Sequence, residues 1–342
     1  MEKLLNLKQF QKNRRDLLLD YKIYEENFNE CVDTFEVVTR GRANPHPDSK
    51  PVNAMTSTEQ RAWDAVDHLT TCYSAGHTVD ELGNFYMIAL HYWEEYAKYH
   101  ETYHDSVETE AERGFPHFGL PEAGDFYRTN RMVCFAILLG HGQLLPRLVS
   151  VIDYNNHQLD GMLERLFAFY VDGRSTPPDE CTRHLPYFKT LKIFNAAPKD
   201  RPELMAEYLE DWYEASRREY YHDSHERRTS FLGYWSWEAA AITFLLNIDD
   251  ASYKDAQFYP KDLVEFARNL NAKGPQPAGS TPLAKERQRC EGGQPCPETG
   301  LWFTPAKTDS QQIFRQGDKM PIYNTDYGAT IWYWVQGQVR HS

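Results

Sequence analysis

The sequence predicts a mainly α-helical protein: a bundle of long antiparallel helices followed by a small C-terminal β-rich module. Apolar and aromatic residues recur at helical spacing through most of residues 4–270. The run Ala239–Leu246 is apolar on almost every side, as expected for a helix in the centre of a bundle. From Leu301 onward, short alternating aromatic and polar runs separated by Gly and Pro indicate strands.

The length of 342 residues allows one large domain with a sizeable core and a small second one. We expect a helical domain at 1–272, which could be subdivided near 114–124, a Pro- and Gly-rich linker at 273–299 and the β-rich module at 300–342. No apolar run resembles a signal peptide or reaches the roughly 18 residues of a membrane span, and the six cysteines are scattered. We therefore expect a cytoplasmic protein that does not enter a membrane.

The formal net charge of −13 is unevenly distributed. Residues 273–342 hold eight Lys/Arg and six Asp/Glu, so they carry +2 and the first 272 residues carry −15. This balance argues against direct binding of nucleic acid, which needs basic surface to neutralise phosphate. It suits a basic protein partner, although acidity can also serve solubility alone.

The N-terminal helices follow from apolar spacing and terminal residues. Residues 4–39 predict one long or once-broken helix, and the Pro-marked linker RANPHPDSKP follows it. Thr56 or Ser57 could cap the next helix, which ends near Gly76. A third helix is expected at 78–104, and the loop GFPHFGLPEAG comes after it.

The later helices are expected in a continuous series, with breaks at Pro and Gly. Their predicted ranges are 125–140, 143–153, 158–169, about 183–195, 202–218, 239–246 and about 259–270. The runs Phe135–Gly140 and Ala241–Asn247 are both apolar helix ends closed by a turn residue. They indicate either two related helix pairs or the ordinary appearance of buried helix ends.

One motif has the spacing of a zinc peptidase. In His100-Glu101-Thr102-Tyr103-His104 the two His share a helix face, and the Glu could act as a general base. The charged Asp105 follows directly, and no Gly and third His extend the motif, although Glu122 or Asp125 remains open as a third ligand. The acidic surroundings are typical of a solvated helix end, so we predict no metal and no cofactor and keep a zinc metallopeptidase as an alternative function.

Three smaller groups have a functional and a structural interpretation. His222 and His225 could bind zinc but more simply cap or bridge at the entrance to the central helix. Cys290 and Cys296 cannot form a structural zinc site alone, so a disulfide or two buried thiols is expected. The Trp and Glu side chains of WSWEAAA could line a ligand pocket, but aromatic residues at helical spacing usually belong to the core.

Catalytic motifs are otherwise missing from the sequence. It contains no GxSxG, no Walker loop, no GxGxxG before a helix and no clear Cys-His nucleophile setting. We therefore predict a binding protein that is not an enzyme.

Several spaced blocks lie between Pro202 and Leu270: Tyr208–Tyr213, Asp223–His225, Gly233–Ala241, Asp249–Asp250 and Tyr259–Leu263. In order and spacing, these blocks resemble the C-terminal domain of the PoNi immunity proteins. The residues that carry this family motif are Gly233, Tyr234, Trp235, Trp237, Glu238, Tyr259 and Pro260. The helix pair from Arg131 to Asp153 also looks like the part just upstream, whereas the first 120 residues carry no residue-level signature.

The C-terminal tail contains three further blocks: Cys296-Pro297-x-Thr299-Gly300-x-Trp302, Phe314-x-x-Gly317-x-x-Met320-Pro321 and Tyr327-Gly328-x-Thr330-Ile331-Trp332. With these blocks the tail looks like a short module found on other immunity proteins of secreted bacterial toxins. The usual PoNi pattern lacks this appendage, so the class of toxin stays open.

The PoNi family neutralises PoNe-type DNase toxins of polymorphic and type VI secretion systems. The resemblance implies a bacterial cytoplasmic immunity protein that binds the catalytic domain of a cognate toxin, most simply a nuclease, and blocks its active site or substrate surface. Exposed acids near helix ends are the expected toxin-binding residues: Glu207, Glu210, Glu214, Asp249 and Asp250. For Asp249 and Asp250, a structural role in the turn is the favoured interpretation. A helical scaffold for a partner other than a toxin is a further alternative, and self-association is undetermined.

Overall fold

The computed structural model describes residues 3–107, 114–174, 176–227, 231–270, 289–304, 310, 312–323 and 330–334. The chain divides into two compact units, one within residues 1–278 and the other within 279–342. The first unit is helical and the second is built on strands, which confirms the predicted fold class. Its helices are α1 (Leu7–Asn13), α2 (Tyr21–Ala43), α3 (Pro51–Ala75), α4 (Val79–Ser106), α6 (Ala123–Leu138), α7 (Leu145–Ile152), α8 (Gly161–Phe167), α9 (Thr190–Asn195), α10 (Arg201–Ala215), α11 (Ser224–Arg227), α12 (Trp237–Leu245) and α13 (Lys261–Leu270), with short 3-10 turns at Gly142–Leu144, Tyr187–Lys189 and Pro198–Asp200.

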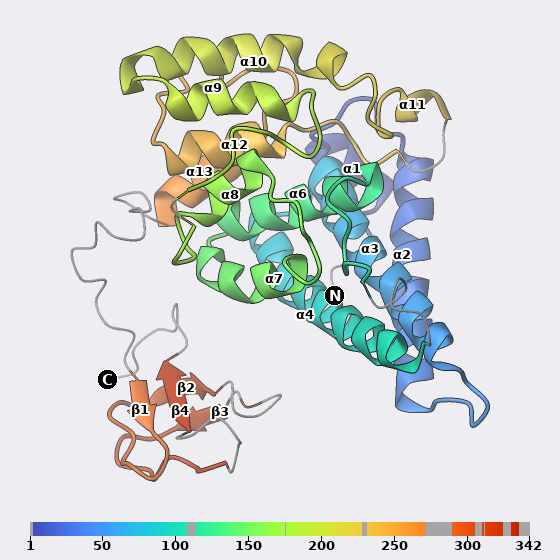
Figure 1. The fold of residues 1–342 in the computed structure, drawn as a ribbon, viewed down its shortest axis with the longest axis vertical. Helices are drawn as coiled ribbons and strands as arrows, with labels where there is room; N and C mark the ends of the chain where they lie inside the picture. Colours follow the sequence, from blue (N-terminus) through green and yellow to red (C-terminus); the bar gives the residue numbers. More distant parts are fainter. Residues whose placement is uncertain are drawn as a thin grey trace. The chain divides into compact units, whose positions relative to one another are not determined.

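Three long helices, α2, α3 and α4, pack side by side, with α3 between the other two (Figure 1). The predicted helix at 4–39 is broken, because residues 14–20 separate α1 from α2 and the Asp20 side chain caps α2. Helix α3 begins at Pro51, earlier than the predicted caps at Thr56 or Ser57. Proline has no N–H to lose at the first position of a helix and its φ already suits one, so it starts a helix well. Thr78 and Glu81 form the capping box of α4.

Helices α6 and α12 form the central pair of the unit, and α13 packs against both. Every residue of α12 is buried, as its apolar sequence predicted. Both central helices end alike, because His141 N donates to Ala136 O at 2.7 Å and Ile248 N donates to Thr243 O at 2.9 Å. In each, the residue before that donor has a positive φ: Gly140 at +77° and Asn247 at +48°. Both helices therefore end in a Schellman motif, which turns the chain back over the core.

Helices α9 and α10 pack on each other, and α10 also contacts α12. Figure 1 shows the pair along one edge of the helical unit, with α12 and α13 below it. The predicted helix at 183–195 is only partly helical, because it begins as a 3-10 turn at Tyr187 and becomes α9 at Thr190. No helix among the described residues is long and apolar enough to cross a bilayer.

The second unit contains a four-stranded antiparallel sheet in the order β1-β4-β2-β3. Its strands are β1 (Arg289–Glu291), β2 (Gly300–Phe303), β3 (Gln312–Phe314) and β4 (Ile331–Trp334). Its core is formed by Cys290, Cys296, Trp302, Phe314, Met320 and Trp332. The prediction of a linker up to residue 299 was wrong for its last part, because β1 pairs with β4 through Cys290 opposite Trp332.

Candidate functional site

The residues of the predicted family motif lie inside the protein. Gly233 has a φ of +105°, and a Cβ at this position would lie 2.2 Å from the Ser74 Oγ, so only glycine fits. The next backbone N–H, that of Tyr234, donates to the Asp16 Oδ2 at 2.9 Å, and the Trp235 Nε1 donates to the Ser74 Oγ at 2.9 Å. The motif therefore attaches the start of α12 to the end of α3 and to the chain before α2.

Glu238 is the most enclosed acid of this region, with a side chain at the start of α12 that is 1% exposed. Its Oε1 accepts hydrogen bonds from the Tyr208 hydroxyl and the Trp212 Nε1, each at 2.7 Å. The Ser236 hydroxyl also donates to the Oε1 at 2.7 Å, and the Asn130 Nδ2 donates to the Oε2 at 3.2 Å. Four donors satisfy this buried carboxylate, which forms no ion pair with the described residues, and two of the donors come from α10. Glu238 thus attaches α10 to the centre of the bundle, and the WSWE side chains belong to the core rather than to a ligand pocket.

Asp249 and Asp250 differ in their surroundings. Asp250 pairs with Arg268 at 2.8 Å and accepts from the Tyr259 hydroxyl at 3.1 Å, so it connects the turn after α12 to α13. Asp249 is exposed, and its Oδ1 accepts from the backbone N–H of Ala251. Of the two, only Asp249 has its carboxylate on the surface, and Asp250 has the structural role.

The other predicted acids lie together on the outer side of α10. Glu203, Glu207, Glu210 and Glu214 are exposed and follow the spacing i, i+4, i+7, i+11, which places them within roughly 60° of one another around the helix. We call these four residues the acidic stripe. The opposite side of α10 is buried and carries Met205, Tyr208, Leu209 and Trp212.

The acidic stripe is electrostatically unfavourable for the helix that carries it. Like charges at i, i+4 cost about 0.2–0.5 kcal/mol per pair, and Glu203/Glu207 and Glu210/Glu214 are such pairs. Glu214 also lies in the last turn, where the helix dipole favours cations and no basic residue is present, whereas Glu203 lies in the first turn, where the dipole favours an acid. Among the described residues, no cation lies within ion-pair distance of Glu203, Glu210 or Glu214. Violations of this kind are expected where a surface is shaped by function.

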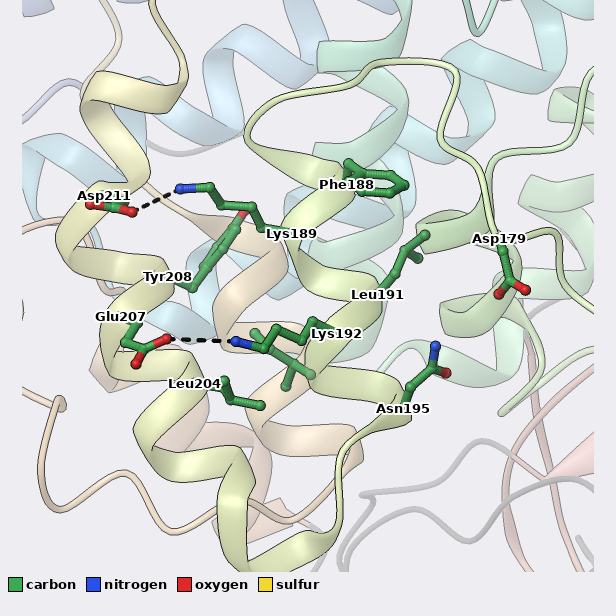
Figure 2. Close-up of a pocket in the computed structure, with 11 residues that line it drawn as sticks. Asp179, Phe188, Lys189, Leu191, Lys192, Asn195, Leu204, Glu207, Tyr208 and Asp211 are labelled. Carbon is green, nitrogen blue, oxygen red and sulfur yellow. Dashed lines mark hydrogen bonds and ion pairs between the residues drawn. The ribbon is translucent and has the colours of Figure 1, made fainter.

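A groove of about 520 Å³ lies beside the stripe, between α9 and α10. Its apolar lining includes Leu191, Leu204 and the ring of Phe188. Figure 2 shows two lysines of the α9 segment reaching across to acids of α10. Lys189 pairs with Asp211 at 2.8 Å and Lys192 pairs with Glu207 at 4.0 Å, and each of these four side chains is more than a third exposed.

The HExxH motif belongs to a buried cluster of aromatic rings. The ring centroids of His100 and His104 are 3.9 Å apart, that of His117 is 4.9 Å from His100, and Tyr154 stacks on His117 at 4.0 Å. Burial, with the other two imidazoles nearby, lowers the pKa of His100 to about 3, and burial lowers the pKa of His117 to about 4. The imidazoles of His100 and His117 are therefore neutral near pH 7. Glu101, the proposed base, is instead exposed on the surface and approaches His117 Nε2 at 3.4 Å.

No metal site forms from the residues that the structure describes, since no three of their His, Cys, Asp and Glu side chains are placed to hold an ion. Asp125, considered as a third ligand, accepts from the backbone N–H of Gly119. His225 bonds to the Tyr234 hydroxyl at 2.7 Å, in agreement with a bridging role. Cys290 and Cys296 are free thiols, which settles the choice between a disulfide and buried thiols.

Sequence reasoning missed the groove and the lysines that cross it. A signal existed for the stripe, because Glu203 continues the spacing of the three predicted glutamates on α10. Nothing in the sequence indicated that Lys189 and Lys192 would face Asp211 and Glu207, since the two helices meet only in the folded chain.

The helical unit therefore presents an acidic stripe on α10 and, beside it, a partly apolar groove. Residues 158–263, which include α8 to α12, match the family model of PoNe immunity proteins (PoNi), C-terminal. The chain is therefore PoNi-like in this part, in agreement with the resemblance of its motif blocks. No curated protein matches the chain. The crystal structure of protein PA2201 from Pseudomonas aeruginosa is similar, with a TM-score of 0.64 at 20% sequence identity over 75% of this chain and 91% of that chain, which shows a shared fold.

Proposed function

We propose that this protein is an immunity protein that binds the catalytic domain of a cognate toxin through the acidic stripe of α10 and blocks its action. One observation carries the proposal: the stripe lies within the PoNi-like residues 158–263. In that segment, glutamates that disfavour their own helix are held outward on a helix attached to the core through Glu238. A cationic partner would relieve the repulsion among them.

The most suitable toxin is a nuclease of a type VI secretion system. A nuclease presents basic surface to its nucleic acid, and carboxylates on the inhibitor can occupy that surface. The protein would act in the bacterial cytoplasm by stoichiometric binding, with no catalysis, no cofactor and no contact of its own with nucleic acid or membrane.

Co-expression with the toxin domain encoded next to this gene tests the proposal. The wild-type chain should restore growth and co-elute with the toxin domain in size-exclusion chromatography. The triple variant Glu203→Lys, Glu210→Lys, Glu214→Lys should lose both, by at least a hundredfold in Kd, since like charges across an interface cost several kcal/mol.

A control with the same change in net charge uses helix α2. Glu26, Glu30 and Asp33 are exposed there, and their replacement by Lys should leave growth rescue intact. Absence of any complex with the wild-type chain contradicts the proposed function. A complex lost equally in the α2 and α10 variants would show that net charge, rather than the stripe, determines binding.

A further inference from the structure

The groove between α9 and α10 has a mixed lining that restricts what can occupy it. Leu191, Leu204 and Phe188 provide apolar surface, and Phe188 is 39% exposed in the free protein. The rim on the α10 side carries Glu207 and Asp211. An occupant that matches both has an apolar side chain flanked by cations.

The two ion pairs that cross the groove are weakly held. Lys192 and Glu207 are 71% and 62% exposed, and Lys189 and Asp211 are 38% and 66% exposed. Exposed pairs of this kind contribute about 0–1 kcal/mol each, because solvent screens them and two long side chains must be ordered. A partner's cations can therefore replace both lysines at little cost, and the lysines then swing into water.

We propose that this groove receives a segment of the toxin in which an aliphatic or aromatic side chain is flanked by Lys or Arg. The apolar side chain enters the space lined by Leu191 and Leu204, and the cations pair with Glu207 and Asp211 in place of Lys192 and Lys189. This inference rests on the proposed function and adds to it the chemistry of the toxin's contact and a competition between internal and external cations. The net charge of −13 for the whole chain favours a cationic occupant over a second copy of this chain.

Removal of the internal lysines gives the sharpest test. Lys189→Ala with Lys192→Ala should tighten binding of the toxin domain by about threefold to tenfold, because the acids no longer have competing partners. Were the two ion pairs needed only to hold α9 against α10, the same variant would bind more weakly. Isothermal titration calorimetry with a catalytically inactivated toxin domain measures the difference.

Filling the groove should have the opposite effect. Leu204→Trp should weaken binding by at least thirtyfold while every acid remains in place, and the loss should lie mainly in the dissociation rate. Circular dichroism and urea unfolding check that the variant folds. As a matched control, Val37→Trp changes an apolar α2 residue that is 62% exposed, and it should leave Kd unchanged.

A photo-crosslinking amino acid at position 204 of the full-length chain identifies the occupant. Crosslinks to a Lys- or Arg-flanked apolar segment of the toxin domain support the proposal. Crosslinks to a second copy of this chain, or to its own residues 279–342, overturn it. If the wild-type complex forms and both the Leu204→Trp and the double-lysine variants bind like wild type, the groove is not the binding site, and the proposed function is unaffected. If the wild-type chain forms no complex at all, the proposed function itself is contradicted.

Discussion

The two sides of α10 use the same chemistry in opposite ways. On the inner side, Tyr208 and Trp212 donate to the buried carboxylate of Glu238, which also accepts from Ser236 and Asn130. On the outer side, the glutamates of the acidic stripe are exposed, and among the described residues only Glu207 has a cation nearby, Lys192 at 4.0 Å. The carboxylate of Glu238, which is costly to bury, accepts four hydrogen bonds. The carboxylates of the acidic stripe, which cost little to expose, repel one another. This contrast indicates that the inner side of α10 stabilises the helix, whereas its outer side is free to bind a partner.

The largest expected effect is the loss of the inner carboxylate. Glu238→Ala leaves four donors without an acceptor in the core and should lower the free energy of unfolding by about 3–5 kcal/mol. Urea unfolding followed by circular dichroism measures it. Glu214→Ala on the outer side is the control, and it should change stability by about 0.5 kcal/mol or less. Similar losses for the two variants would remove the contrast between the sides.

The histidine cluster extends the contrast to a buried polar atom that no hydrogen bond of the described residues satisfies. The Nδ1 of His100 has no hydrogen-bond partner among the described residues, and the folded pKa of about 3 lies below the unfolded value of about 6.5. The unfolded chain therefore binds protons first, so the stability from the neutral imidazole is complete above about pH 6.5 and is lost progressively as the pH falls to about 3. Wild type should lose roughly 3 kcal/mol more than His100→Gln between about pH 6.5 and pH 4, because each unit of pH between the two pKa values costs about 1.4 kcal/mol.

Unfolding free energies measured at several pH values test this difference. Burial raises the pKa of Asp64 to about 6, which acts in the opposite direction, but Asp64 is present in both proteins and cancels in the comparison. Parallel profiles for wild type and His100→Gln would show that the cluster is not the source of the pH dependence.

A smaller effect is expected for single donors on the inner side. Burial, with Glu238 nearby, raises the pKa of Tyr208 well above its ordinary value, so its hydroxyl remains a donor. Tyr208→Phe keeps the ring and removes that donor, and it should cost about 1.5–2 kcal/mol, less than Glu238→Ala. Chemical denaturation at fixed pH distinguishes the two variants. A cost equal to that of Glu238→Ala would mean that Tyr208 alone satisfies the carboxylate.

The smallest effect has the opposite sign. Glu210→Gln with Glu214→Gln removes like-charge repulsion near the C-terminal end of α10, where the helix dipole disfavours negative charge. The variant should stabilise the free protein by about 0.5 kcal/mol. The gain should shrink in 1 M salt, where exposed charges are screened. The same variant should bind the toxin domain more weakly. A loss of stability instead would mean that these acids support the fold.

Much of the helical unit could be predicted from local patterns. The spacing of Leu204, Tyr208, Leu209 and Trp212 identified α10, and the apolar run after Ser236 identified α12 as the centre of the bundle. The start of α3 was missed because a proline that opens a helix looks like a proline in a linker. Strand β1 was missed because three residues carry no alternation, and its pairing with β4 lies far along the chain.

The candidate site was only half accessible to sequence reasoning. The exposed glutamates at 207, 210 and 214 follow from helical spacing alone. The donors of Glu238 do not, because Asn130 lies 108 residues away and reaches it only when α6 packs on α12. The groove depends in the same way on the contact of α9 with α10, for which neither helix carries a separate signal.

The length of the acidic stripe has a consequence for the speed of encounter. From Glu203 to Glu214 the helix rises by about 16 Å, which is roughly twice the distance over which salt screens a charge at physiological ionic strength, about 8 Å. An approaching basic protein therefore meets a line of charge rather than a point, and it can be captured at many positions and slide into register. If the protein inhibits a nuclease as proposed, it competes with nucleic acid for the same basic surface, and a fast association rate then matters as much as a slow dissociation rate. Association should accordingly slow steeply as salt is added, while dissociation, governed by the apolar groove, changes little.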